Sequence, residues 1–292
     1  MREKTQADYK KLAEHFYAMR LPGQTPTGKK IADALAACAT DYRPAYWVKL
    51  RGALAYDQEQ RGYRDAAERL RQLKNPVREK GLPVKSRQRR VKTINEQDEQ
   101  KLLEALLRKP DVPVISALYI AKLTGVRPAE MFSLQIRDNR LLVTGAKKSH
   151  GGLRGADREI ILEPDLMARM PSLIAGLRVE GYTSVTPIQH RLRYTCKKLW
   201  PRRRFWPSLY SWRHQMGSNL RADDRDRVEV AYIMGHQSTK SVDQYGDKRT
   251  AKGGASLPQV PEAKDLGRIR VKHRTAQLSV EFDFGFEGPD RR

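Results

Sequence analysis

The sequence is poor in the residue types that build metal centres and disulfide frameworks. Among its 292 residues it has two cysteines, Cys38 and Cys196, and six scattered histidines. Neither cysteine has the spacing of a metal ligand, and two such distant cysteines are typical of a reducing compartment. We therefore expect two small core residues, no metal, no cofactor and a cytoplasmic protein.

Long hydrophobic runs are also missing. No stretch approaches the ~18–20 apolar residues of a transmembrane helix. The first residues, "MREKTQADYKKLAEHFYAMR", are charged throughout and lack the apolar centre of a signal peptide. We therefore expect no membrane partner.

Acidic residues are few beside the basic ones. The chain has 34 Asp and Glu against 57 Lys and Arg, a formal net charge of +23 and a pI of about 10.1. This excess is far larger than solubility requires, and it favours a polyanionic partner, with nucleic acid as the first choice. At 39% hydrophobic residues the chain can still build a core, and its length allows two domains.

Helical periodicity dominates residues 1–74, which we interpret as a small basic helical domain. Thr27 is a candidate cap for its second helix. Residues 75–92, "NPVREKGLPVKSRQRRVK", contain two prolines, a glycine and a basic run, and are typical of a linker. A linker this basic is suited to lie along a phosphate backbone, with Arg87, Arg89 and Arg90 as DNA contacts.

Residues 93–250 predict a second, helix-rich domain with a small sheet. The first helix has Thr93 or Asn95 as its cap, and the very apolar "VPVISALYIAKLTG" predicts a buried helix that ends at Gly125. "LLVTG" and "REIIL" predict two strands around a polar loop. The fold class is therefore mainly α with a small β-sheet, an α+β arrangement.

The tail, residues 251–292, differs from both domains. In "LSVEFDFGF" apolar and polar residues alternate, which predicts a half-buried strand near 278–286. A single strand must join a sheet edge, either in its own chain or in a neighbouring protomer.

Four places in the second domain carry polar residues that suit chemistry. Arg127 in "LTGVRPAE" lies between two helices, near an N-terminus that favours anions. Lys147 and Lys148 lie in the loop between the two strands, where a lysine can reach into a groove or toward a phosphate, so Lys148 is also a candidate DNA contact. Ordinary solvated lysines are common in such loops as well. A third place, "RLRYTCKKLWPRRRFWPSLYSWRHQM", mixes basic and aromatic residues as a nucleic-acid groove does, although the aromatics suit a core equally well. Its candidate DNA contacts are Arg202, Arg203 and Arg204, and Arg213 follows them.

The fourth place is "YIMGHQSTKSVDQYG". His236 follows a helix stop at Gly235, and Tyr245 stands nine positions later at the end of a polar run that suggests a tether. The alternative is a helix stop followed by a surface tyrosine. Arginines, a lysine, a histidine and a tyrosine together suit phosphoryl transfer without a metal, because arginines stabilise phosphate charge and a tyrosine hydroxyl is a nucleophile.

The order and spacing of these pieces resemble the tyrosine recombinase (phage integrase) family. The matching motifs are "TGVRPAE", a strand-loop lysine, "YSWRH", "MGHQS" and the tyrosine, over residues 93–250. The resemblance implies a core-binding domain in front of the catalytic domain.

The resemblance also implies a mechanism. Tyr245 would attack a DNA phosphodiester and form a 3′-phosphotyrosyl link, with Arg127 and Arg213 on the phosphate and His236 supporting it. Lys147, or alternatively Lys148, would protonate the leaving 5′ oxygen. Exchange of strands would need neither metal nor ATP, and Glu130 would brace Arg127.

One position departs from the family pattern. Tyr210 stands three residues before Arg213, where the family usually has His or Lys. A phenol with a pKa near ~10 donates a hydrogen bond to phosphate but is a poor base at neutral pH. The resemblance further implies a homotetramer on paired double-stranded DNA sites, accessory DNA-bending proteins, and a prokaryotic nucleoid-associated enzyme of a plasmid or phage.

Two other classes remain open at this stage. A non-enzymatic DNA-binding or architectural protein would explain the charge alone. A type IB topoisomerase-like or telomere-resolving enzyme would share the tyrosine chemistry but differ in outcome.

Overall fold

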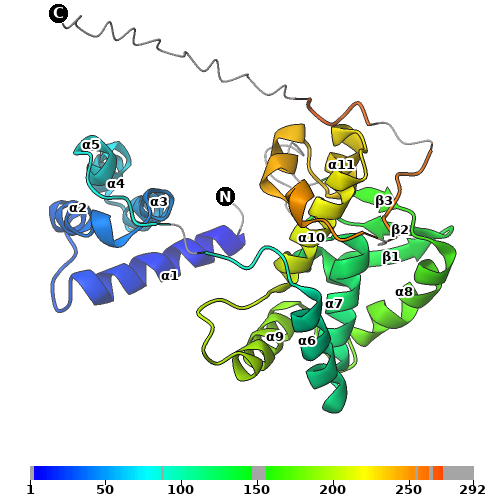
Figure 1. The fold of residues 1–292 in the computed structure, drawn as a ribbon. Coiled ribbons are helices and arrows are strands. Elements are labelled where there is room, and N and C mark those ends of the chain that lie inside the picture. Colours follow the sequence, from blue (N-terminus) through cyan, green and yellow to red (C-terminus); the bar gives the residue numbers. More distant parts are fainter. Residues whose placement is uncertain (1–2, 87–88, 147–155, 254–255, 263–265, 272–292) are drawn as a thin grey trace, which may run out of the picture. The chain divides into compact units, whose positions relative to one another are not determined.

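The computed structural model describes residues 3–86, 89–146, 156–253, 256–262 and 266–271 (Figure 1). The chain divides into two compact units, Met1–Arg89 and Arg90–Arg292. The predictions on Arg87, Lys147, Lys148 and the strand near 278–286 lie outside the described residues.

The first unit is helical, as its periodicity predicts. Its elements are α1 (Glu3–Arg20), α2 (Gly28–Ala37), the 3₁₀ helix η1 (Ala39–Asp41), α3 (Pro44–Gln60), α4 (Arg64–Gln72) and α5 (Pro76–Glu79). Thr27 caps α2 as expected, because its side chain accepts a hydrogen bond from the Lys30 amide. The core gathers around Trp47, which is fully buried and donates its indole N–H to the Leu35 carbonyl (2.9 Å).

The segment expected to be a linker is not extended throughout. Asn75 caps α5 by accepting from the Val77 amide (3.0 Å), and Val77 packs into the core of the first unit. This short helix follows from local sequence, since a proline directly after an asparagine suits the start of a helix.

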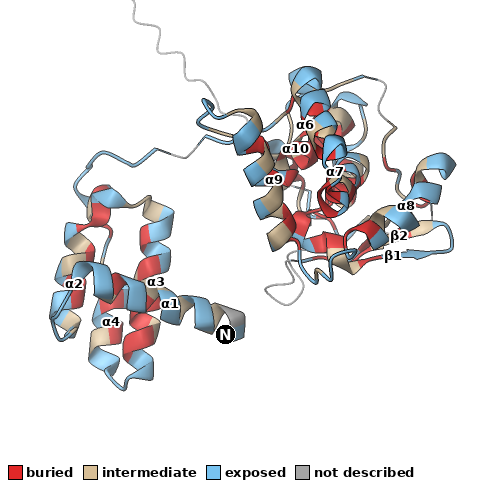
Figure 2. Cartoon of the chain, turned by 90° about the horizontal axis from the view of Figure 1, so that it is seen from below, coloured by how far each residue is buried: buried red, intermediate tan, exposed pale blue. Residues whose placement is uncertain are grey.

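The second unit is also mainly helical. Its helices are α6 (Glu96–Arg108), α7 (Val112–Thr124), α8 (Pro164–Gly176), α9 (Thr186–Leu199), α10 (Leu209–Ala222) and α11 (Arg227–Ile233), with the 3₁₀ helices η2 (Pro128–Ser133), η3 (Thr239–Gln244) and η4 (Lys248–Thr250). Helix α7 packs against α6, α8, α9 and α10, so it lies at the centre of the unit (Figure 2). This position explains why α7 is mostly apolar, with only Val112, Tyr119 and Lys122 exposed.

Both ends of the central helix are fixed by its sequence. Asp111 caps the start by accepting from the Val114 amide (3.2 Å). Gly125 ends the helix in the left-handed conformation (φ 61°), as expected from the sequence. Asn95 caps α6 and accepts from the Asp98 amide (2.7 Å), so it is the cap of the two candidates.

The sheet has three antiparallel strands in the order β1-β2-β3. They are β1 (Leu134–Arg137), β2 (Arg140–Val143) and β3 (Arg158–Ile160), with Leu134 opposite Val143 and Leu141 opposite Ile160. The sequence predicts β2 and β3 but not β1. Only the first residue of β1 is buried, so its sequence carries almost no alternating pattern.

Gly125 gives a test of this packing. A Cβ at this position would lie 2.6 Å from Cγ of Met216. The substituted residue would also have to adopt the left-handed backbone conformation (φ 61°), which is strained for residues other than glycine. Gly125→Ala is expected to lower the free energy of unfolding by about 2–4 kcal/mol. Gly181→Ala is the control, because Gly181 has a similar φ (72°) and nothing within 4 Å, and it should cost only about 1 kcal/mol. Urea unfolding followed by tryptophan fluorescence measures both, and equal losses would contradict the packing argument.

Candidate phosphoryl-transfer site

Arg127 stands at the corner between α7 and η2. Its Nη1 forms an ion pair with Oε1 of Glu130 (2.7 Å), and its backbone amide donates to Oε2 of the same carboxylate (2.9 Å). The contact expected between these two residues is therefore present. Glu130 is fully buried, and neighbouring Arg158 and Arg127 lower its pKa to about 2 against the opposing effect of burial. The charged carboxylate fixes the arginine at a rigid corner.

Arg213 lies in α10 and is fully buried. Its guanidinium donates to the carbonyls of Gly125 and Met234, the latter at 2.6 Å. Burial and the nearby Arg127 and Arg158 lower the pKa of Arg213 to about 9, so it is still charged at neutral pH. Its Nε has no hydrogen-bond partner among the described residues.

Three arginine side chains lie at the C-terminal end of α11. Gly235 adopts the left-handed conformation (φ 62°), and the amides of Gly235 and His236 bond back to the carbonyls of Tyr232 (2.8 Å) and Ala231 (2.7 Å). This glycine-dependent termination leaves the next three carbonyls without partners inside the helix.

Those three carbonyls each accept from a different arginine. The Ile233 carbonyl accepts from Nε of Arg158 (2.8 Å). The Met234 carbonyl accepts from Arg213 (2.6 Å), and the Gly235 carbonyl accepts from Nη2 of Arg127 (2.8 Å). The negative end of α11 therefore holds the guanidinium groups in one cluster.

Arg158 is a member of this cluster that sequence reasoning missed. It begins β3, and its fully buried side chain forms an ion pair with Oε2 of Glu130 (2.9 Å). In β3 the buried positions are Arg158 and Ile160, so the alternation places the arginine on the inward face. That register was the only available signal, and a three-residue strand is too short to establish it from sequence.

His236 lies beside Arg213 and is buried. Its Nε2 is 3.1 Å from Nη2 of Arg213, and a guanidinium can only donate. Nε2 is therefore the acceptor and Nδ1 carries the proton. Burial first, and then the nearby arginines, lower the pKa of His236 to about 2, so the ring is neutral. Nδ1 is buried and has no hydrogen-bond partner among the described residues.

Tyr245 packs on this cluster. Its ring centroid lies 4.8 Å from the His214 ring, 4.9 Å from the His236 ring and 4.8 Å from Cζ of Arg213. The structure therefore brings Tyr245, His236 and Arg213 together, and Arg127 and Glu130 join them through the end of α11.

The segment before Tyr245 is not the extended tether that its polar sequence suggests. It forms η3, capped by Ser238, with Val242 buried in a small core. Arg227 holds it from outside through an ion pair with Asp243 (2.9 Å). Polar residues here cover a folded turn because one buried valine is enough to dock it.

The backbone after Tyr245 is also anchored to α10. A Cβ on Gly246 would lie 2.2 Å from the Ser218 amide nitrogen, so only glycine permits this approach. Ser218 Oγ accepts from the Asp247 amide (2.9 Å), and Arg221 donates to the Gly246 carbonyl (2.7 Å). Tyr245 is thereby held by its own chain on both sides.

Tyr210 and His214 flank the arginine on α10. Burial is the main cause of the raised pKa of Tyr210, followed by the nearby Tyr245, so its phenol stays protonated at neutral pH. Burial, and then Lys92 and Arg213, lower the pKa of His214 to about 4. Tyr210 is suited to donate a hydrogen bond rather than to accept a proton.

The loop expected to carry the general-acid lysine, Lys147 or Lys148, begins beside the arginine cluster. The Ala146 amide donates to Oε1 of Glu130 (3.5 Å), and the Gly145 amide donates to Asp157 (2.8 Å). The last described residue before Lys147 therefore lies beside the carboxylate that braces Arg127.

The expected DNA contacts fall into two groups. Arg89, Arg90, Arg202 and Arg204 are exposed. Arg203 is exposed as well, but it pairs with both oxygens of Asp98 (2.6 and 2.9 Å) and stacks on Trp200, so its charge is already paired within the fold. Next to Arg90, the Val91 carbonyl accepts from Ser211 Oγ (2.6 Å), which fixes this end of the basic segment to the start of α10.

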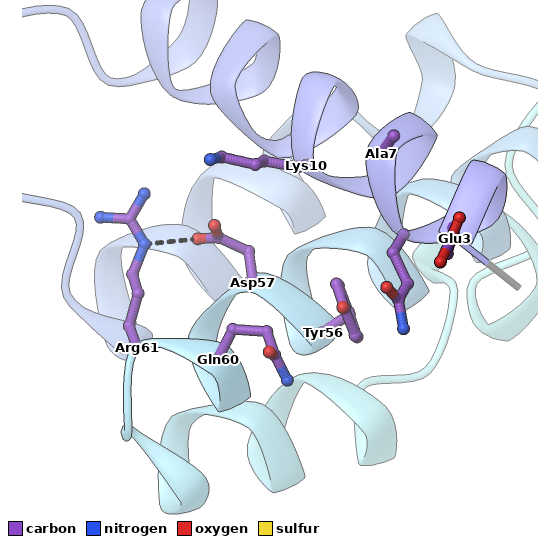
Figure 3. Close-up of a pocket in the computed structure, with 8 residues that line it drawn as sticks. Glu3, Ala7, Lys10, Tyr56, Asp57, Gln60 and Arg61 are labelled. Atoms are coloured by element: carbon purple, nitrogen blue, oxygen red, sulfur yellow. Dashed lines mark hydrogen bonds and ion pairs between the residues drawn. The ribbon is translucent and has the colours of Figure 1, made fainter. Parts of the chain in front are cut away.

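A pocket of about 590 Å³ in the first unit lies between α1 and α3 (Figure 3). Its most buried carboxylate, Asp57, already accepts from Arg61 Nε (2.8 Å) and the Tyr17 hydroxyl (2.7 Å). Asp57 therefore stabilises the unit rather than facing a ligand. In the described ranges no group of three or more His, Cys, Asp or Glu side chains is placed to hold a metal ion.

The arrangement in the second unit suits a phosphate. Three guanidinium groups surround one carboxylate among the described residues, and the adjacent histidine is neutral. Two positive charges are therefore not matched by the carboxylate, and they lie beside a tyrosine. Such a cluster favours an anion whose charge grows during reaction.

The neutral histidines predict a pH dependence of stability. Both pKa values are lowered on folding, to about 2 for His236 and about 4 for His214, so below about pH 6.5 the unfolded chain takes up protons first. Stability is full above that pH and falls as the pH is lowered. Glu130 adds a loss only below about pH 4.5, its usual pKa.

His236 alone should account for a loss of about 2 kcal/mol between pH 7 and pH 5. Urea unfolding at the two pH values measures the loss, and His236→Asn should show a correspondingly smaller one. An unchanged pH dependence in that variant would contradict the neutral buried ring.

Comparison with known proteins gives structural matches only. No protein-family model matches the sequence, and no curated protein does. The chain is similar to a lambda integrase tetramer bound to a Holliday junction (TM-score 0.58, 18% identity, 87% of this chain and 74% of that chain). It is also similar to a dimer of lambda integrase residues 75–356 bound to a COC′ core site (0.58, 18%, 90% and 93%).

A third solved structure is that of the Tn1549 transposon integrase in complex with a circular intermediate DNA (TM-score 0.54, 13% identity, 85% of this chain and 90% of that chain). None of the helices in the described part of the chain combines the length and hydropathy needed to cross a bilayer. The mainly helical chain with its three-stranded sheet has the fold of the tyrosine recombinases.

Proposed function

We propose that this protein is a site-specific DNA recombinase that cuts and rejoins DNA through a covalent 3′-phosphotyrosyl intermediate. The observation that carries the proposal is the convergence of Tyr245, His236 and Arg213 around one cluster, with Arg127 held by the same helix end. The net charge of +23 and the DNA named with the similar integrases support DNA as the partner.

Each group has a distinct role in the proposed step. The Tyr245 oxygen bonds to phosphorus and gives its proton to solvent water, while the bond to the 5′ oxygen breaks and that oxygen gains a proton from Lys147. Arg127 and Arg213 stabilise the extra negative charge on the non-bridging oxygens as the transition state forms. His236 donates through Nδ1, the one ring nitrogen that its contact with Arg213 leaves free.

Tyr210 takes the place that the family usually gives to His or Lys. With its pKa raised by burial, it donates a hydrogen bond to the phosphate and leaves proton abstraction to other groups. The reverse step uses a 5′ hydroxyl of a partner duplex, which attacks phosphorus and releases Tyr245. No metal, cofactor or ATP takes part in either step.

Recombination requires two DNA sites to be held together. We propose a homotetramer in which the segment near 278–286 packs on its own or a neighbouring protomer, with accessory DNA-bending proteins. The basic segment at Arg89 and Arg90, with Arg202 and Arg204, would follow the DNA backbone. The enzyme would act in the nucleoid of a prokaryote, on plasmid or phage DNA.

The covalent intermediate gives the central test. The full chain first selects its site from a random-sequence duplex pool, and that duplex is then nicked near the cleavage point to trap the adduct. Wild type should form a covalent protein–DNA adduct and Tyr245→Phe none, because a phenyl ring has no nucleophilic oxygen. Tyr119→Phe, on exposed α7 surface, is the control and should keep the adduct.

The same assay separates the competing functions. Absence of any adduct from wild type would favour a DNA-binding or architectural protein. An adduct accompanied by relaxation of supercoiled DNA without strand exchange would favour a type IB topoisomerase-like enzyme, and hairpin ends would favour a telomere-resolving one.

The general acid gives a second test. Lys147→Ala should slow cleavage at least about 100-fold with little loss of DNA binding, because general acid catalysis contributes on that scale. A substrate with sulfur in place of the leaving 5′ oxygen should restore most of the rate, since a thiolate leaves without a proton. If Lys147→Ala cleaves normally while Lys148→Ala needs the sulfur substrate, the role belongs to Lys148.

A further inference from the structure

Arg158 occupies the centre of the arginine cluster without being exposed to solvent. Its side chain has no accessible surface, its Nη2 pairs with Glu130 (2.9 Å), and its Nε donates to the Ile233 carbonyl (2.8 Å). Arg158 therefore connects the sheet, through β3, to the carboxylate and to the end of α11. Its Nη1 is buried and has no partner among the described residues.

The two carboxylate oxygens of Glu130 pair with two different arginines. Oε1 pairs with Arg127 Nη1 (2.7 Å), whereas Oε2 pairs with Arg158 Nη2 and the Arg127 amide (2.9 Å each). If Arg158 were removed, Arg127 would be the only arginine among the described residues that pairs with this carboxylate. The positive charge that Arg127 offers a phosphate would then be largely neutralised by Glu130.

Gly235 is shaped around the same arginine. A Cβ at this position would lie 2.4 Å from Nη1 of Arg158 and 3.0 Å from Nη1 of Arg127. The glycine is therefore required for space as well as for its backbone conformation. The turn that presents His236 is packed directly on Arg158.

We propose that Arg158 is a positioning residue of the phosphate site. It occupies half of the Glu130 carboxylate, so that Arg127 keeps its charge for the phosphate, and it holds the end of α11 that presents His236. Its Nε and Nη2 are held by the Ile233 carbonyl and Glu130, and its Nη1 lies beside Gly235, so it acts through these groups rather than on the substrate. This inference rests on the proposed recombinase function, which supplies the phosphate.

The test compares Arg158→Met with a matched arginine on the same sheet. Arg140 in β2 pairs with Glu159 (3.2 Å) but is partly exposed, so Arg140→Met removes a similar ion pair away from the cluster. The measurements use the full chain, the duplex it selects from a random pool, and inorganic phosphate as a probe that needs no DNA cleavage.

Arg158→Met is expected to bind the duplex within about 3-fold of wild type and to slow single-turnover cleavage about 10- to 100-fold. Loss of one unit charge from the arginine cluster is expected to have an effect of that size. Binding of inorganic phosphate, measured by calorimetry, should weaken about 10-fold or more. Arg140→Met should leave all three quantities unchanged.

A second variant separates charge from simple loss of structure. In Arg158→Met with Glu130→Gln, one arginine and the carboxylate are both removed, so the surplus of positive charge returns. Cleavage should then be at least about 5-fold faster than in Arg158→Met alone, whereas a purely structural role predicts a further loss. If Arg158→Met does not fold, Arg158→Gln takes its place, since it removes the same charge but keeps a polar side chain.

The outcomes are distinct. Wild-type cleavage and phosphate affinity in Arg158→Met, or no recovery in the double variant, would overturn the inference. If wild type itself forms no adduct, the recombinase function fails, and the phosphate affinities of wild type and Arg158→Met still decide whether Arg158 organises an anion site.

Discussion

Hydrogen bonding at the end of α11 is the constraint on which the site depends. A helix that terminates at a left-handed glycine leaves carbonyls without partners. Here three consecutive carbonyls, of residues 233 to 235, each accept from a different arginine. The same turn directs His236 towards Arg213, so one local feature of the backbone places the charges and the neutral donor together.

Burying three guanidinium groups with one carboxylate is unfavourable in itself. Burial is the main cause of the lowered pKa values of Arg213 and His236, and repulsion from the neighbouring arginines lowers them further. The same repulsion would make binding of an anion such as the phosphate of the proposed reaction more favourable.

Those parts of the candidate site whose structure depends on neighbouring residues in the sequence were predictable. The motifs around Arg127 and His236 imply a rigid corner and a helix stop, and both are present. The inward register of Arg158 was not predictable, because it depends on how three short strands pair. The docking of η3 was missed for a related reason, since burial of Val242 is established only by distant parts of the chain. Helix positions, in contrast, follow periodicity and capping, which are local.

The hydrogen-bond acceptors at the end of α11 are backbone carbonyls, so the arginine cluster depends little on which side chains stand at these positions. Ile233 and Met234 bind arginines through peptide oxygens, which every residue type carries, so other apolar side chains of similar size can replace them and keep the cluster. Of these three residues, only Gly235 is restricted by both conformation and space. A cluster held largely by peptide oxygens is therefore compatible with a fold shared at 13–18% identity.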